Sequence, residues 1–161
     1  MVNVVLIRQI LQGRNKVRRV GEQALKVDGR CHCGFISFEA DADPAKTGMC
    51  CCTDCQALTG GAFRITIPAE PGSFRLLSGE PTTYVKTADS GTKRRHAFCP
   101  RCGTPVYATG LGDDPKPYSL RFGTLRQREH FKPSVQIWTR SKAVWVDHIA
   151  DIPSFPMARP A

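Results

Sequence analysis

Apolar and polar residues alternate in short runs along most of this chain from Gly29 onward. In the runs 35–39 (FISFE) and 62–67 (AFRITI), apolar side chains recur at about every second position. A period of two places successive side chains on opposite faces of a β-strand. Glycine and proline separate such runs at short intervals, as turns between strands require. Strands are therefore expected over residues 35–39, 62–67, 73–77, 82–87, 93–98, 105–109, 118–125 and 136–145.

The predicted fold class is mainly β with short helical turns. One helical turn is expected over residues 54–58, where Thr53 can cap its start and Gly60 can end it. Residues 1–28 differ, because an apolar start precedes a basic stretch. We expect a basic N-terminal extension over residues 1–28, a single domain over residues 29–155 and a tail over residues 156–161.

Composition fits a water-soluble globular protein. Of 161 residues, 41% are hydrophobic and 23% are charged. No apolar run approaches the ~20 residues that a membrane-spanning helix needs, so no membrane partner is expected. Arg8 interrupts the apolar start and no cleavage site follows, which argues against a secretory signal. The sequence predicts a cytoplasmic protein, and in that reducing compartment closely spaced cysteines are more often metal ligands than disulfides.

The net charge of +9 is unevenly distributed. Residues 1–30 contain seven basic and two acidic residues, so they carry +5 of it. A basic balance can indicate a nucleic acid, an anionic surface or an acidic small molecule as partner. We interpret the basic stretch as a solvated extension. Nucleic-acid binding is not expected, because the chain lacks aromatic residues interleaved on a basic face.

Four of the eight cysteines form two pairs that suit a closed metal site. Cys31 and Cys33 flank one histidine, and Cys99 and Cys102 stand in the sequence C-P-R-C-G. Four thiolates saturate a tetrahedral zinc ion. On a strand, Cys31 and Cys33 would project to one face and His32 to the other. The sequence predicts a structural zinc on these four sulfurs; two unrelated buried cysteine pairs are the alternative.

Three further cysteines suit an open metal site. In the run C-C-C-T-D-C, Cys50 and Cys52 share a face of an extended segment, Cys51 faces away, and Cys55 returns from the following turn. Three sulfurs leave one zinc coordination position for water or a substrate thiol. Cys50, Cys52 and Cys55 are therefore predicted as both metal ligands and catalytic residues. A redox pair of Cys52 and Cys55, a structural site that includes Cys51, and an iron–sulfur cluster remain alternatives.

These motifs together resemble the glutathione-dependent formaldehyde-activating enzyme family. The resemblance covers residues 27–155 and rests on G-R-C-H-C-G (29–34), C-C-C-T-D-C (50–55), F-C-P-R-C-G-T-P (98–105), G-T-L (123–125) and I-W (137–138). It implies a β-tent fold over the domain expected at 29–155. It also implies a structural zinc on Cys31, Cys33, Cys99 and Cys102 and a labile, catalytic zinc on Cys50, Cys52 and Cys55.

The resemblance further implies a carbon–sulfur lyase whose partner is a small-molecule thiol such as glutathione. Formaldehyde would add to the glutathione thiol to give S-hydroxymethylglutathione. Arg64, Arg94, Arg95 and Arg121 are candidates to bind the glutathione carboxylates, without a choice among them. By contrast, His96, His130 and His148 have no partner at a ligand spacing and are expected to be ordinary histidines.

The chain departs from the family pattern at three positions. Cys51 stands where a histidine is usual, Arg126 where an acidic residue is common, and Gln136 where a histidine is common. These changes preserve the expected fold and metal ligands but weaken the assignment of a substrate. The alternative function is a non-catalytic, zinc-stapled β module for protein interaction, because one fold can serve different functions.

Overall fold

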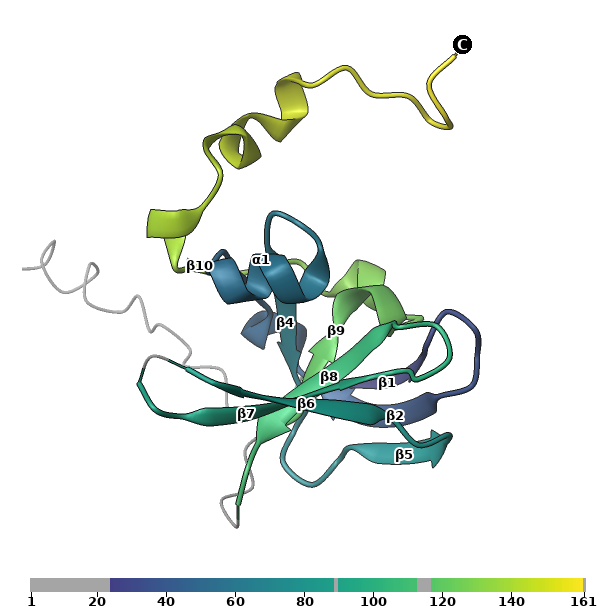
Figure 1. Ribbon diagram of the computed structural model, residues 1–161. Helices are drawn as coiled ribbons and strands as arrows, with labels where there is room; N and C mark the ends of the chain where they lie inside the picture. The colour runs from purple at the N-terminus through teal and green to yellow at the C-terminus, as the bar shows by residue number, and fades with distance from the viewer. Residues whose placement is uncertain (1–23, 89, 113–116, 161) are drawn as a thin grey trace, which may run out of the picture.

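Two β-sheets form the body of the protein (Figure 1). The computed structural model describes residues 24–88, 90–112 and 117–160. The smaller sheet is antiparallel and has the order β1 (Leu25–Arg30), β2 (Ser37–Ala42) and β5 (Arg75–Ser78). The larger sheet has the order β10 (Val135–Ile137), β3 (Gly48–Cys50), β4 (Arg64–Pro68), β9 (Ser119–Arg121), β8 (Pro105–Gly110), β7 (Lys93–Phe98) and β6 (Thr82–Thr87). Its strand pairs are antiparallel except β10 with β3.

The helices are short and lie between or after the strands. Helix α1 (Thr53–Thr59) follows β3 and ends at Gly60, which has a left-handed backbone with φ 65°. Its N-cap is Cys52 rather than Thr53, because the Cys52 sulfur accepts the backbone N–H of Cys55. Short 3₁₀ helices occupy Pro44–Lys46, Phe122–Thr124, Arg128–His130, Thr139–Ser141 and Val144–Asp151. The mainly β class with short helical turns is thus confirmed.

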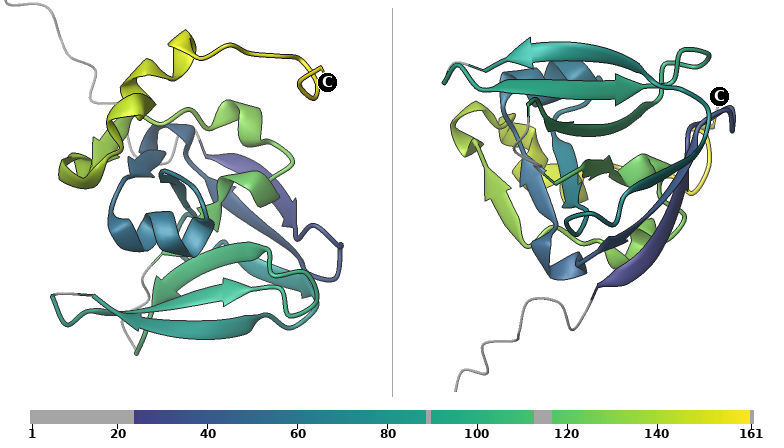
Figure 2. Two further views of the ribbon diagram at one scale, coloured as in Figure 1. Left: turned by 45° about the horizontal axis from the view of Figure 1, so that its top comes forward. Right: turned by 90° about the horizontal axis from the view of Figure 1, so that it is seen from below.

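The hydrophobic core lies where the two sheets face each other. Alternate residues of β2, including Phe38 and Ala40, are buried, as the period of two predicts. They pack with Ile67, Val106 and Leu120 of the larger sheet. The three-dimensional arrangement places the smaller sheet across one face of the larger one (Figure 2). The opposite face of β4 and β9 is therefore free to carry polar side chains.

One glycine of β1 is required by this packing. Gly29 pairs with Phe38 of β2, and a Cβ atom added at Gly29 would lie 2.2 Å from the Phe38 ring. Because the Phe38 side chain is fully buried, its ring has no space into which to move. The first glycine of the sequence G-R-C-H-C-G therefore fixes how closely the two strands approach just before the first cysteine pair.

Several boundaries differ from the sequence-based expectation. The strand expected over residues 118–125 is too long, because β9 ends at Arg121 and a 3₁₀ helix follows over Phe122–Thr124. Strand β1 begins at Leu25, so residues 25–28, which composition places in the extension, pair with β2. Residues 1–23 of the expected extension lie outside the described residues. The long strand expected over 136–145 is wrong, because β10 ends at Ile137 and Trp138 has a left-handed backbone with φ 59°. None of the described helices is long and apolar enough to cross a membrane.

Candidate metal centres and an adjoining pocket

The four cysteines expected to form a closed site lie together in the structure. Cys31 and Cys33 stand in the turn after β1, and Cys99 and Cys102 stand in the turn between β7 and β8. All four Sγ atoms lie within 4.8 Å of one another. The Sγ atoms of Cys31 and Cys33 are 3.6 Å apart, and those of Cys33 and Cys99 are 3.7 Å apart. This group joins the smaller sheet to the larger one.

Turns, rather than a strand, hold both cysteine pairs. The expected strand geometry at Cys31 and Cys33 is wrong, since β1 ends at Arg30 and the backbone N–H of Gly34 closes a turn onto the Cys31 carbonyl at 3.0 Å. In the second turn, Gly103 donates to the Cys99 carbonyl at 2.9 Å with a left-handed φ of 71°. In each turn the chain therefore bends so that the two cysteine sulfurs lie close together.

The three cysteines expected to form an open site also converge. Cys50 ends β3, Cys52 caps α1 and Cys55 lies in the first turn of α1. Their Sγ atoms lie within 4.8 Å of one another, with Cys50 and Cys52 3.5 Å apart. Burial raises the pKa of the Cys55 thiol, and the positive charge of Arg64 opposes this rise. The charge of Arg64 therefore favours the thiolate that a metal would bind.

Cys51 takes no part in the group of three sulfurs. Its side chain is fully buried, and it does not belong to the metal-compatible groups found among the described residues. Its backbone instead anchors the C-terminal segment. The Cys51 N–H donates to the Ile137 carbonyl at 3.0 Å, and its carbonyl accepts from Gln56 Nε2 and Ser141 Oγ. This geometry does not support the alternative in which Cys51 completes a four-sulfur site.

Both sulfur groups fit a zinc ion. Four ligands about 2.3 Å from a tetrahedral zinc stand about 3.8 Å from one another. The observed Sγ separations of 3.5, 3.6 and 3.7 Å match that spacing. All eight cysteines are free thiols, so none is committed to a disulfide. In addition, hydrogen bonding by Thr104 lowers the pKa of Cys102 to about 5, which favours the thiolate form of a ligand.

A pocket of about 480 Å³ lies near the group of three sulfurs, because Arg64, which lines it, pairs with Cys50 across β3 and β4 and acts electrostatically on Cys55. Helix α1, which carries Cys55, contributes Leu58 to its lining one turn later. The other lining residues are Arg64, Tyr84, His96, Ala97, Phe98, Gly103, Pro105 and Arg121. Of the four arginines considered from the sequence, the structure therefore places Arg64 and Arg121 at this pocket. The lining residues Gly103 and Pro105 also bring the pocket close to the β7–β8 turn that carries the four-cysteine group.

His96, expected from the sequence to be an ordinary histidine, lies in the lining of this pocket. Its Nδ1 accepts a hydrogen bond from Nη2 of Arg121 at 3.3 Å, since a guanidinium can only donate. Burial lowers the pKa of His96 to about 4, with further lowering by the positive charges of Arg121 and Arg64. Burial likewise lowers the pKa of Arg121 to about 9. The sequence gives no sign that His96 belongs to a site, because Arg121, which it contacts, lies in another strand.

We expect His96 to remain neutral throughout the physiological range. Between pH 6.5, its ordinary pKa, and about pH 4, an unfolded chain takes up a proton on this side chain that the folded chain does not. Its contribution to stability is therefore complete above pH 6.5 and is lost as the pH falls towards 4. Histidine NMR signals followed from pH 8 to 5 should show no titration of His96. Titration of His96 near pH 6.5 would contradict its burial beside Arg121.

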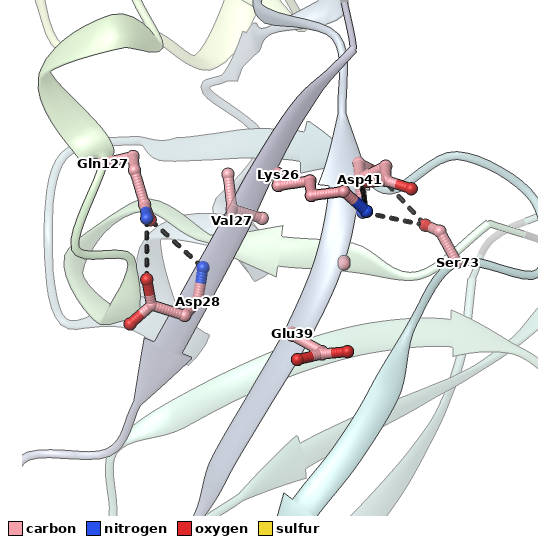
Figure 3. Close-up of a pocket in the computed structure, with 8 residues that line it drawn as sticks. Lys26, Val27, Asp28, Glu39, Asp41, Ser73 and Gln127 are labelled. Atoms are coloured by element: carbon pink, nitrogen blue, oxygen red, sulfur yellow. Dashed lines mark hydrogen bonds and ion pairs between the residues drawn. The ribbon is translucent and has the colours of Figure 1, made fainter.

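A second hollow, of about 370 Å³, lies over β1 and β2 (Figure 3). Its polar groups satisfy one another. Gln127 Nε2 donates to the Asp28 carboxylate at 2.7 Å, and the Asp28 backbone N–H donates to Gln127 Oε1 at 3.1 Å. This reciprocal pair ties β1 to the segment that follows the 3₁₀ helix Phe122–Thr124.

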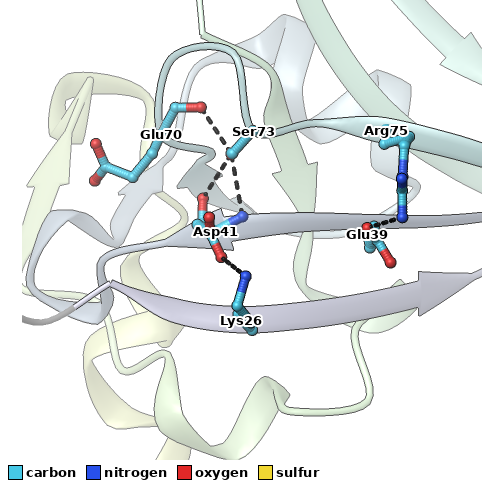
Figure 4. Close-up of polar contacts among 6 residues, drawn as sticks. All are labelled: Lys26, Glu39, Asp41, Glu70, Ser73 and Arg75. Atoms are coloured by element: carbon cyan, nitrogen blue, oxygen red, sulfur yellow. Dashed lines mark hydrogen bonds and ion pairs between the residues drawn. The ribbon is translucent and has the colours of Figure 1, made fainter.

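Ion pairs account for the remaining charges around this hollow (Figure 4). Lys26 lies 3.5 Å from Asp41, and Arg75 pairs with Glu39 across β2 and β5. The side chains are largely exposed, so each pair contributes no more than about 1 kcal/mol. The hollow is a surface network of paired charges, and the candidate site is the pocket beside the sulfurs.

Comparison with known proteins agrees with this geometry. A family profile described as "Glutathione-dependent formaldehyde-activating enzyme" matches residues 26–141. The chain belongs to this family. The family's β-tent fold agrees with the mainly β structure and its two metal-compatible cysteine groups. Membership supports a function in glutathione and formaldehyde chemistry.

A solved structure shows the same fold. It is the crystal structure of a Rhodobacter sphaeroides protein, which matches with a TM-score of 0.51 and 22% sequence identity. The match covers 68% of this chain and 98% of the other chain. At this level of identity the likeness concerns the fold, so the assignment of chemistry depends on this chain's own site.

Proposed function

We propose that the protein is a zinc-dependent carbon–sulfur lyase that acts on glutathione, or a similar small thiol, and formaldehyde. The observation that carries the proposal is the convergence of three sulfurs, those of Cys50, Cys52 and Cys55, near a pocket of about 480 Å³. Family membership supports the choice of substrates. The four sulfurs of the other group would fill all coordination positions of a zinc ion and leave none for a substrate thiol. The four-cysteine group is therefore assigned a structural role.

The reaction joins one sulfur to one carbon. Cys50, Cys52 and Cys55 would hold the zinc ion, and such an ion supplies an open coordination position at which the pKa of a small-molecule thiol falls. The glutathione sulfur forms a bond to the formaldehyde carbon, the carbon–oxygen double bond becomes a single bond, and the oxygen takes the proton that the thiol loses. The product is S-hydroxymethylglutathione, and the reverse reaction breaks the same carbon–sulfur bond.

The chain's own residues provide position and a suitable environment. The pocket walls formed by Leu58, Phe98 and Pro105 are apolar and exclude water from one side of the ligand. Arg64 and Arg121 place positive charge near the thiolates: the charge of Arg64 acts to lower the pKa of Cys55, and the negative charge of the Cys55 thiolate acts to raise the pKa of Arg121. Holding two reactants in one pocket replaces a collision in solution by a bound arrangement, which is the main source of acceleration proposed here.

The zinc-loaded protein is expected to accelerate the exchange between glutathione and S-hydroxymethylglutathione above its spontaneous rate. NMR exchange spectroscopy with ¹³C-formaldehyde measures both directions at equilibrium. Elemental analysis should find two zinc ions per chain, of which glutathione or a mild chelator removes one. An exchange rate equal to the spontaneous rate would reject the lyase. Two zinc ions that both resist glutathione would instead favour the non-catalytic interaction module.

A further inference from the structure

Two arginines and a cysteine lie on the same face of three neighbouring strands of the larger sheet. Cys50 of β3 pairs directly with Arg64 of β4, so their side chains share a face. Arg121 of β9 pairs with Thr66, which is two residues from Arg64 and hence on that same face. Strands β4 and β9 are adjacent in the sheet (Figure 1). The register of these strands therefore places both positively charged side chains on the face that carries Cys50, and both also line the pocket.

Both guanidinium groups are buried without adequate partners. Arg64 and Arg121 are each only 6% exposed. Nε of Arg64 and both Nε and Nη1 of Arg121 are buried and have no hydrogen-bond partner among the described residues. The contact of Arg121 with His96 uses only Nη2. A buried donor without an acceptor is unfavourable, so these nitrogens are better explained by a ligand that supplies acceptors than by the packing of the protein alone.

The pocket lining contains no negatively charged side chain that could accept these hydrogen bonds. The residues that line it include no aspartate or glutamate. Two arginines at one end and apolar side chains around the remainder suit a ligand with an anionic group joined to a less polar body. A carboxylate matches a guanidinium group particularly well because its two oxygens accept parallel N–H donors.

We infer that Arg64 and Arg121 form a carboxylate subsite, which holds an acidic end of the thiol substrate beside the three-cysteine group. This inference rests on the proposed function and makes it more specific, since the protein then selects thiols that carry a carboxylate over neutral thiols. His96 acts as a positioning residue, because its neutral ring accepts from Arg121 and directs the remaining donors into the pocket.

A competing explanation is that the arginines only compensate the charge of the thiolates. Arg64 does favour the Cys55 thiolate. That role would be measured as zinc affinity, whereas the subsite is measured as affinity for a carboxylate ligand that has no thiol. The two explanations can therefore be separated with S-methylglutathione, which retains both carboxylates but cannot bind zinc as a thiolate.

The experiment measures S-methylglutathione binding to the zinc-loaded protein by calorimetry, with Arg121→Met and Arg64→Met as variants. Each variant should weaken binding by about 10-fold or more, since each removes a charge-assisted hydrogen-bonding group. Arg95→Met is the matched control. Arg95 is exposed and lies on the face of β7 opposite His96, so its removal should leave the affinity unchanged. The dimethyl ester of S-methylglutathione should bind the wild-type protein weakly and lose little further affinity in the variants.

The stability of the ligand-free variants provides a second measurement. Because Arg121→Met removes a buried charge with unpartnered donors, its melting temperature should equal that of the wild type or rise by roughly 2–4 °C. A lower melting temperature with unchanged S-methylglutathione affinity would show a structural role and overturn the inference. Loss of zinc with unchanged affinity would overturn it in favour of charge compensation, and absence of binding to the wild type would also overturn it.

Failure of the proposed function has a different signature. Arginine-dependent binding of S-methylglutathione without any acceleration of carbon–sulfur bond formation would support the subsite and reject the lyase.

Discussion

Replacing Cys99 with serine is expected to abolish the folded domain. The Cys99 side chain is fully buried and belongs to the hydrophobic core together with Cys31. Its group of four sulfurs joins the turn after β1 to the turn between β7 and β8, and so connects the two sheets. Structural zinc contributes roughly 10–16 kcal/mol in apparent terms, whereas the total stability of a domain is about 5–15 kcal/mol. Loss of this site therefore removes a contribution as large as the stability itself.

The measurement is thermal unfolding together with the amide NMR spectrum of the purified variant. Cys99→Ser should give no cooperative transition and poorly dispersed amide signals. The control is Cys51→Ser, which alters an equally buried thiol outside both metal-compatible groups. That variant should lose about 1–3 kcal/mol and remain folded. A Cys99→Ser protein that melts cooperatively within a few degrees of the wild type would show that the four-sulfur group is not a structural centre.

The strands and the helix whose ends are set by nearby residues could be predicted from the sequence. Strands β6 and β7 have the predicted bounds, because alternating residues and flanking turns determine where they begin and end. Helix α1 was expected nearly in place for the same reason, with Gly60 ending it. Strand β3 was missed: its three residues are all buried, so it has no alternation to detect. Strand β10 was made too long, since its length depends on pairing with β3.

The same distinction applies to the candidate site. The cysteine groups could be divided into four and three because each pair or triplet is close in sequence. The arginines could not be chosen from sequence, because only the pairing of β3, β4 and β9 places Arg64 and Arg121 on the face that carries Cys50. His96 had no ligand-like spacing, and its role follows from contact with Arg121, 25 residues away. A site formed by residues from several strands can be predicted only when the pairing register of those strands is known.

Replacing Cys52 with serine is expected to remove activity while the domain remains folded. Cys52 is only partly buried, and it caps α1 by accepting the Cys55 backbone N–H at 3.4 Å. A serine hydroxyl performs the same capping role, so helix α1 should still begin at Thr53. A hydroxyl is nevertheless a much poorer zinc ligand than a thiolate. The substitution thus separates the helix cap from the metal-binding function of the same side chain.

The expected result is one zinc ion per chain instead of two, with exchange of formaldehyde on glutathione reduced to its spontaneous rate. Replacing a residue that only hydrogen-bonds to a zinc ligand typically lowers metal affinity or activity by about 10–100-fold. Loss of a ligand itself should therefore lower the activity by more than about 100-fold. Elemental analysis, thermal unfolding and ¹³C exchange NMR on one preparation measure the three properties together. Cys51→Ser again serves as the control and should retain both ions and the activity. If Cys52→Ser unfolds as Cys99→Ser does, both sulfur groups are structural, and the assignment of an open, reactive centre to Cys50, Cys52 and Cys55 is wrong.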